Sequence, residues 1–90
     1  MRDLQQIAHS LESLIDLVVP ETSTVSVVTI HPGFVRFAVV NGRYVVDPSG
    51  RLEPGKRGTA SVVLHRPSDI DPELFADWLR QAVEIEAIAA

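Results

Sequence analysis

The chain of 90 residues contains no cysteine and only one tryptophan, one tyrosine and one methionine. The lack of cysteine excludes disulfide bonds and thiolate metal sites, and it favours an intracellular location. No stretch reaches the ~20 consecutive apolar residues that a membrane-spanning helix needs. The first six residues also lack the apolar stretch of a signal peptide. We therefore expect a cytoplasmic protein that does not bind membranes.

Ninety residues are too few for two independent hydrophobic cores, so we expect one domain over residues 1–90. The net charge of −4 is distributed unevenly along the chain. Residues 31–66 carry six basic against two acidic side chains, whereas residues 1–30 and 67–90 are both acidic. Such asymmetry can mark a binding surface, or it can reflect charges that neutralise one another within the fold.

Two amphipathic helices are predicted at the ends of the chain. The first stripe has apolar residues at three- and four-residue spacing, and Pro20 ends it. Its members are Leu4, Ile7, Ala8, Leu11, Leu14, Ile15 and Val18. The second helix is predicted to begin at Asp71-Pro72-Glu73, where Asp71 caps free N–H groups and Pro72 suits the first helical position. Its buried stripe comprises Leu74, Phe75, Trp78, Leu79, Ala82 and Val83.

The residues between the helices favour strands near 24–30, 34–40, 43–47 and 59–66, because they are rich in β-branched and aromatic types. Asn41-Gly42 suits a two-residue type I′ turn, which would pair the second and third strands and place Arg36 opposite Asp47. The sequence therefore predicts an α+β fold of helix, four-stranded antiparallel sheet and helix. Both helices need an apolar surface to cover, so we place them on one face of the sheet.

This arrangement leaves the other sheet face open. It mixes apolar side chains with arginine, a composition that is enriched where proteins meet. A long loop between the last two strands adds positive charge beside it. The candidate partner-binding residues on the face and the loop are Phe34, Arg36, Arg43, Val45, Arg51, Lys56 and Arg57.

The segment Gly50–Lys56 matches seven positions of the phosphate-loop pattern G-x-x-x-x-G-K-[ST], and Arg57 breaks the pattern at the eighth. A phosphate loop must lead into a helix, whereas the residues after Lys56 alternate like a strand. Two turns explain the glycines better: a type I turn at residues 47–50 and a type II turn at residues 53–56. We therefore do not expect a nucleotide site.

No other motif indicates catalysis, a metal or a cofactor. His9, His31 and His65 lack zinc-ligand spacing, and we interpret them as surface or turn residues, with His31 at the start of a His-Pro-Gly turn. No Gly-x-Ser-x-Gly elbow is present, and Trp78 falls in a buried stripe. The sequence thus favours a protein that is not an enzyme and that binds neither a metal nor a cofactor.

Three functional hypotheses follow. The first is a small non-enzymatic interaction module, such as an accessory, inhibitor or assembly protein of bacteria or phages, which binds itself or a protein partner through the open face and the basic loop. The second is a nucleic-acid-binding protein that uses the basic middle. The order helix, strands, helix resembles the topology of the YbaB/EbfC family of small dimeric nucleoid proteins, which implies binding to DNA. The third is an enzyme subunit whose site forms only at an interface.

Overall fold

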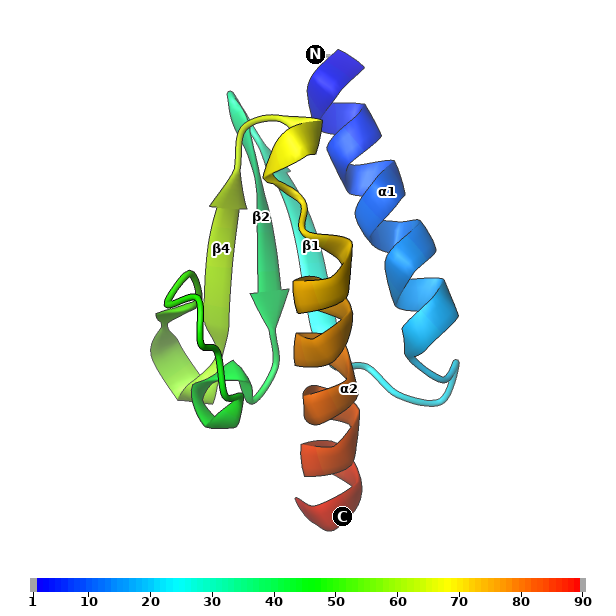
Figure 1. Cartoon of the computed structure of the whole chain (residues 1–90), viewed down its shortest axis with the longest axis vertical. Helices are drawn as coiled ribbons and strands as arrows, with labels where there is room; N and C mark the ends of the chain where they lie inside the picture. Colours follow the sequence, from blue (N-terminus) through cyan, green and yellow to red (C-terminus); the bar gives the residue numbers. More distant parts are fainter. Residues whose placement is uncertain (1, 90) are drawn as a thin grey trace.

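The computed structural model describes residues 2–89 and contains a helical layer packed on one antiparallel sheet (Figure 1). Helix α1 spans Arg2–Val18 and helix α2 spans Pro72–Ala89. The strands are β1 (Ser26–His31), β2 (Phe34–Val39), β3 (Glu53–Pro54) and β4 (Ala60–Leu64). Three single 3₁₀ turns connect them: η1 (Gly42–Tyr44), η2 (Lys56–Gly58) and η3 (Pro67–Asp69). The predicted fold class is confirmed.

The four strands lie in the order β1-β2-β4-β3, with every neighbouring pair antiparallel. The alternation along the two central strands decides which sheet face the helices cover. Val35, Phe37 and Val39 of β2 are fully buried, and so is Leu64 of β4, while Arg36 between them is exposed. Both helices contact this apolar face, as predicted (Figure 1).

An aromatic stack links α2 to the centre of the sheet. The ring centroids of Phe75 and Trp78 are 4.7 Å apart, and those of Phe37 and Phe75 are 5.3 Å apart. All three side chains are completely buried, and burial of a side chain of this size contributes roughly 1.5–3 kcal/mol. Leu11 and Ile7 bring α1 to the same core. The predicted core position of Trp78 is confirmed.

The first hairpin is closed by Pro32 and Gly33, with His31 paired to Phe34. Gly33 has φ 88°, the left-handed backbone that the third position of a type II turn requires, and proline is favoured before it. The predicted His-Pro-Gly turn therefore sets the register of β1 and β2. The predicted start of α2 and the predicted end of α1 are also confirmed. At the start of α2, the N–H of Leu74 donates to Asp71 Oδ1 at 3.2 Å, and α1 ends at Val18, before Pro20.

The predicted Asn41-Gly42 hairpin is wrong, and residues 43–47 do not form a strand. Asn41 does adopt a left-handed φ of 61°, but Gly42 begins the 3₁₀ turn η1 instead of a type I′ turn. Strand β4 occupies the edge of β2 that the hairpin would have used. Arg36 therefore lies opposite Thr29 and Val63, and the predicted cross-strand pair with Asp47 does not form.

Two contacts explain this difference. A Cβ built on Gly42 would lie 2.8 Å from the Cβ of Ala60, so glycine lets the chain pass close to the start of β4. Further along, the backbone N–H and C=O of Val46 form hydrogen bonds with α2 rather than with a strand. Gln81 Nε2 donates to the carbonyl of Val46 at 3.0 Å, and Gln81 Oε1 accepts from its N–H at 2.8 Å. The segment is thereby tied to the helix.

Of the two predicted loop turns, one is confirmed. The N–H of Gly50 donates to the carbonyl of Asp47 at 3.3 Å, and Asp47 accepts further bonds from Ser49 and Leu52. The predicted type II turn at residues 53–56 is wrong, because Glu53 and Pro54 form strand β3. Gly55 is extended with φ −119°. No helix within residues 2–89 is long and apolar enough to cross a membrane.

Replacing Gly42 by alanine tests the close approach to β4. We expect Gly42→Ala to lower the free energy of unfolding by about 1–3 kcal/mol, because the new methyl group overlaps Ala60. Gly55→Ala is the matched control, since its Cβ meets only the Thr59 side chain and carbonyl, at 3.2 and 3.6 Å. Urea unfolding measures both. Equal losses in the two variants would contradict this explanation of Gly42.

Candidate functional site

The sheet face opposite the helices is left uncovered, and we call it the open face. The strand register puts nine strand residues on it. They are Val27, Thr29, His31, Phe34, Arg36, Ala38, Glu53, Ser61 and Val63. Val27 and Val63 are 50% and 38% exposed, so apolar surface faces solvent here.

Aromatic and basic side chains gather at one end of the open face. The imidazole of His31 stacks on Phe34 at 4.7 Å between ring centroids, and the ring of His65 is tilted against Phe34 at 6.2 Å. The guanidinium carbon of Arg36 lies 5.8 Å from the centroid of the same ring. We call these four residues the Phe34 cluster. The three rings form a partly exposed surface, and the guanidinium of Arg36 places a positive charge beside it.

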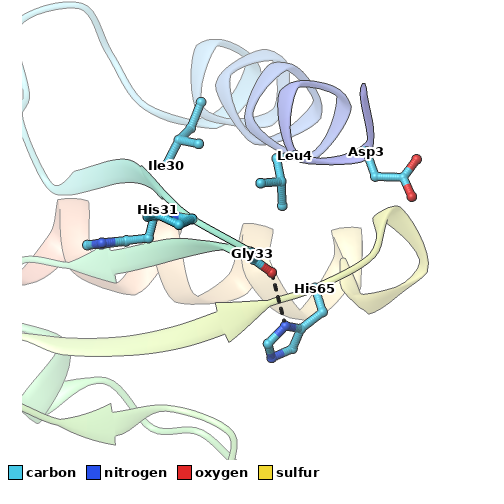
Figure 2. A pocket seen from close by; sticks show the side chains of 7 residues that line it. Asp3, Leu4, Ile30, His31, Gly33 and His65 are labelled. Atoms are coloured by element: carbon cyan, nitrogen blue, oxygen red, sulfur yellow. Dashed lines mark hydrogen bonds between the residues drawn. The ribbon is translucent and has the colours of Figure 1, made fainter. Parts of the chain in front are cut away.

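A shallow hollow of about 720 Å³ adjoins the cluster where α1 approaches the first hairpin. Its lining includes Asp3 and Leu4 of α1 and Ile30 of β1, and Figure 2 shows these on the opposite side of the hairpin from His65. His65 Nδ1 lies 3.4 Å from the carbonyl oxygen of Gly33, which ties the end of β4 to the turn (Figure 2).

Asp69 holds the segment that carries His65. Its Oδ2 accepts the backbone N–H of His65 at 2.8 Å and that of Arg66 at 3.0 Å. These bonds, with the His65 N–H contributing most, stabilise the carboxylate and hold the pKa of Asp69 below its usual value against the opposing effect of burial. The Asp69 carboxylate thus orients the backbone that carries one side of the Phe34 cluster.

Asp47 plays a similar part in the loop after η1. Burial raises its pKa, but the N–H of Leu52 and the hydroxyl and N–H of Ser49 outweigh this, so that the pKa of Asp47 is lowered. The buried indole Nε1 of Trp78 lies near this carboxylate without a hydrogen bond of ordinary geometry.

The candidate residues from the sequence fall into three places. Phe34 and Arg36 lie on the open face, where the guanidinium of Arg36 lies over the ring of Phe34. Arg43, Lys56 and Arg57 are exposed on η1 and η2, two turns that contact each other. Because η2 precedes the start of β4 while Phe34 lies beside its end, this basic group is separated from the Phe34 cluster by the length of β4.

Val45 and Arg51 belong to the fold rather than to an exposed surface. Val45 is only 9% exposed and joins the hydrophobic core. Arg51 donates from Nη2 to the carbonyl of Asp69 at 2.7 Å, and its guanidinium carbon lies 5.2 Å from the centroid of the Phe75 ring. The assignment of Val45 to the open face was wrong because it depended on the Asn41-Gly42 hairpin, which does not form, and Arg43 lies on η1 instead of the open face for the same reason. Arg51 lies on the loop before β3, as predicted, but its guanidinium packs against the fold.

Sequence reasoning left out the contribution of β1 to the open face. Val27, Thr29 and His31 alternate with Ser26, Val28 and Ile30, and the His-Pro-Gly turn fixes their pairing with β2. That alternation and that turn could have placed all three residues on the open face. Within residues 2–89, no group of three or more histidine, aspartate and glutamate side chains is arranged to hold a metal ion.

Comparison with known proteins found no match for this chain among family models, curated proteins or solved structures.

Arg51 offers a test of its structural role. We expect Arg51→Ala to lower the free energy of unfolding by about 1–2 kcal/mol, because it loses a charged hydrogen bond and a contact with an aromatic ring. Lys56→Ala, on the same loop but exposed, should stay within about 0.5 kcal/mol of the parent chain. If chemical unfolding gave both variants the parent stability, the Arg51 contacts would not stabilise the fold.

The lowered pKa of Asp69 gives a pH dependence with a definite sign. A carboxyl group with a folded-state pKa below its unfolded value stabilises the fold at pH above the unfolded value, and this contribution is lost as the pH falls through the folded-state pKa. We therefore expect Asp69→Asn to be less stable than the parent at pH 7, with the difference shrinking as the pH falls below about 4.

Thermal unfolding between pH 2 and 7 measures this difference. Ser68→Ala, at an exposed position of the same turn η3 that cannot ionise, is the control, and any change it causes should be the same at every pH. A deficit of Asp69→Asn that stays constant over the whole pH range would contradict the role given to the ionised carboxylate.

Proposed function

We propose that the chain is a small, non-enzymatic interaction module that docks on a partner protein through its open face. The observation that carries the proposal is the Phe34 cluster on a sheet face that neither helix covers. A two-layer domain that leaves apolar side chains such as Val27 and Val63 exposed on the same sheet face as an aromatic ring has a surface suited to an interface core.

The charges of the face favour a different protein over a second copy as the occupant. Arg36 lies in the middle of β2, and among the nine strand residues of the face the one carboxylate is Glu53, on the edge strand β3. Two copies packed face to face would bring their Arg36 side chains toward each other, which is unfavourable in a desolvated contact. The fitting partner presents a carboxylate to Arg36 and an apolar or aromatic side chain to Phe34.

The first step of the test is to find the partner by site-specific photo-crosslinking. A photoreactive residue at Val63, on the open face, should give a crosslinked product of defined mass in cells, while the same residue at Glu84, exposed on α2, should not. Mass spectrometry of the product identifies the partner, which is then purified.

Binding of the purified partner measures the contribution of the cluster. We expect Phe34→Ala to weaken binding by about 30-fold or more, as for an aromatic anchor at the centre of an interface, and Arg36→Glu to weaken it at least as much. Arg80→Glu, which makes the same charge change on the exposed side of α2, should alter the dissociation constant less than threefold. Unfolding midpoints verify that the variants remain folded.

Two results would overturn the proposal. One is a crosslinked partner whose affinity does not change in either open-face variant. The other is salt-sensitive binding to duplex DNA that is lost when Arg43, Lys56 and Arg57 are replaced by alanine, because this would support nucleic-acid binding by the basic group instead.

A further inference from the structure

Strand β1 has an outer edge that no other strand covers. It is the first strand in the sheet order, and its ladder with β2 has no interruption from Ser26 to His31. The N–H of Val40 donates to the carbonyl of Val25 at 2.8 Å, so Val25 and every second residue after it direct their backbone groups toward β2. It follows that Ser26, Val28 and Ile30 direct their N–H and C=O groups outward.

This edge lacks the features that normally protect an edge strand. Exposed edges are usually interrupted by a bulge or a proline, or carry charged side chains, because a bare row of backbone groups invites another strand to pair. The sequence Ser-Val-Val-Thr-Ile-His has neither proline nor an acidic, lysine or arginine side chain. Val27 and Ile30 are also 50% and 54% exposed. Outside the helices and the strand ladders, no backbone hydrogen bond of the described residues involves Ser26, Val28 or Ile30.

Helix α1 extends the surface beside the β1 edge. Figure 1 shows α1 alongside β1 at one side of the molecule. Asp3 lines the hollow together with Ile30 and His31, so the side of α1 that bears Asp3 is the side next to the β1 edge. With 3.6 residues per turn, Ser10 and Leu17 lie on that same side at seven-residue spacing.

The neighbouring positions complete a row on α1 that begins at Asp3 and is uncharged after it. The exposed members that follow Asp3, at three- and four-residue spacing, are Gln6, Ser10, Ser13 and Leu17. Leu17 is 84% exposed, which is unusual for a leucine on an otherwise amphipathic helix. The exposed Glu12 and Asp16 fall in a separate row, together with Gln5 and His9, roughly 100° around the helix. The β1 edge and the row from Gln6 to Leu17 form one strip, which we call the β1–α1 strip.

We infer that a second copy of this chain binds the β1–α1 strip, with the two β1 strands pairing antiparallel about a twofold axis at Val28. The outward backbone groups then form hydrogen-bonded pairs between Val28 and Val28 of the second copy, and between Ser26 and Ile30. Val27 meets Thr29 of the second copy on the open-face side. The two α1 helices lie next to each other, and their serines permit a close approach.

The composition of the strip favours a second copy over a foreign strand. In a twofold contact, each position near the axis meets itself or a near neighbour, so a single charge there would be repelled by its own copy. Near the axis at Val28 the strip has no charged side chain, although charged residues make up 22% of the chain, and Asp3 lies at the end of the row, beside Ile30 and His31. An isolated strand would satisfy the β1 edge alone, whereas a second copy also covers the row on α1, including Leu17.

Such a dimer would join the two four-stranded sheets into one sheet of eight strands, with both open faces on the same side. The dimer contact uses the edge of the sheet and the row on α1, not the Phe34 cluster. The inference is therefore independent of the proposed docking on a partner, and either one can fail without the other.

Sedimentation velocity of the full chain, with hydrogen exchange, tests the inference. We expect a species of twice the 9.9 kDa monomer mass that dissociates on dilution. In the dimer, the amides of Ser26, Val28 and Ile30 should exchange at least tenfold more slowly than after dilution to the monomer. Val28→Pro removes one outward N–H without removing a bond between β1 and β2, and it should raise the dissociation constant at least tenfold.

Ser10→Arg provides a second variant in case the proline weakens the fold. It places a charge on the side of α1 next to the β1 edge and should also raise the dissociation constant at least tenfold, while Gln5→Arg, in the other exposed row of the same helix, should change it less than threefold. A chain that stays monomeric at millimolar concentration would overturn the inference. So would a dimer that is equally sensitive to Gln5→Arg and Ser10→Arg, or one in which the three outward amides exchange rapidly.

Discussion

The antiparallel ladder between β2 and β4 is the constraint on which the other surfaces depend. It pairs Val35 with Leu64 and Phe37 with Val62, so that the apolar sides of the two central strands coincide. The helices then have one continuous surface to cover, and the aromatic stack from Phe37 through Phe75 to Trp78 forms there. The same ladder turns Arg36 and Val63 to the opposite side. A slip by one residue would exchange the two faces and bury the arginine.

The ladder also leaves β1 as one outer strand and the two-residue β3 as the other. The two edges are therefore unequal. Strand β3 is short and contains a proline, and natural edge strands are often protected in these two ways. Strand β1 has six residues in an unbroken ladder and lacks both features. We interpret the open face and the β1 edge as two separate contact surfaces, one for a partner protein and one for a second copy.

The sequence predicted those parts of the fold that local patterns determine. A few neighbouring residues are enough to predict each of these features. They are the apolar stripes of both helices, the cap at Asp71, the turn at Pro32-Gly33 and the alternation in β2 and β4. The Asn41-Gly42 hairpin failed because its outcome depends on distant residues: Ala60 approaches Gly42, and Gln81 takes both backbone groups of Val46. The candidate site residues lie in separate places for the same reason. The positions of Phe34 and Arg36 follow from alternation, whereas Arg43 and Val45 were assigned to the open face through that hairpin.

The most direct measurement of the central claim is chemical-shift mapping of the isotope-labelled chain with its purified partner. If the open face is the docking surface, the largest amide shifts will fall on β2 and β4 around Phe34, Arg36 and Val63. The exposed side of α2 around Arg80 and Glu84 will stay unshifted. Shifts that concentrate on α2, or on η1 and η2 around Arg43 and Lys56, would contradict the assignment of the open face as the docking surface.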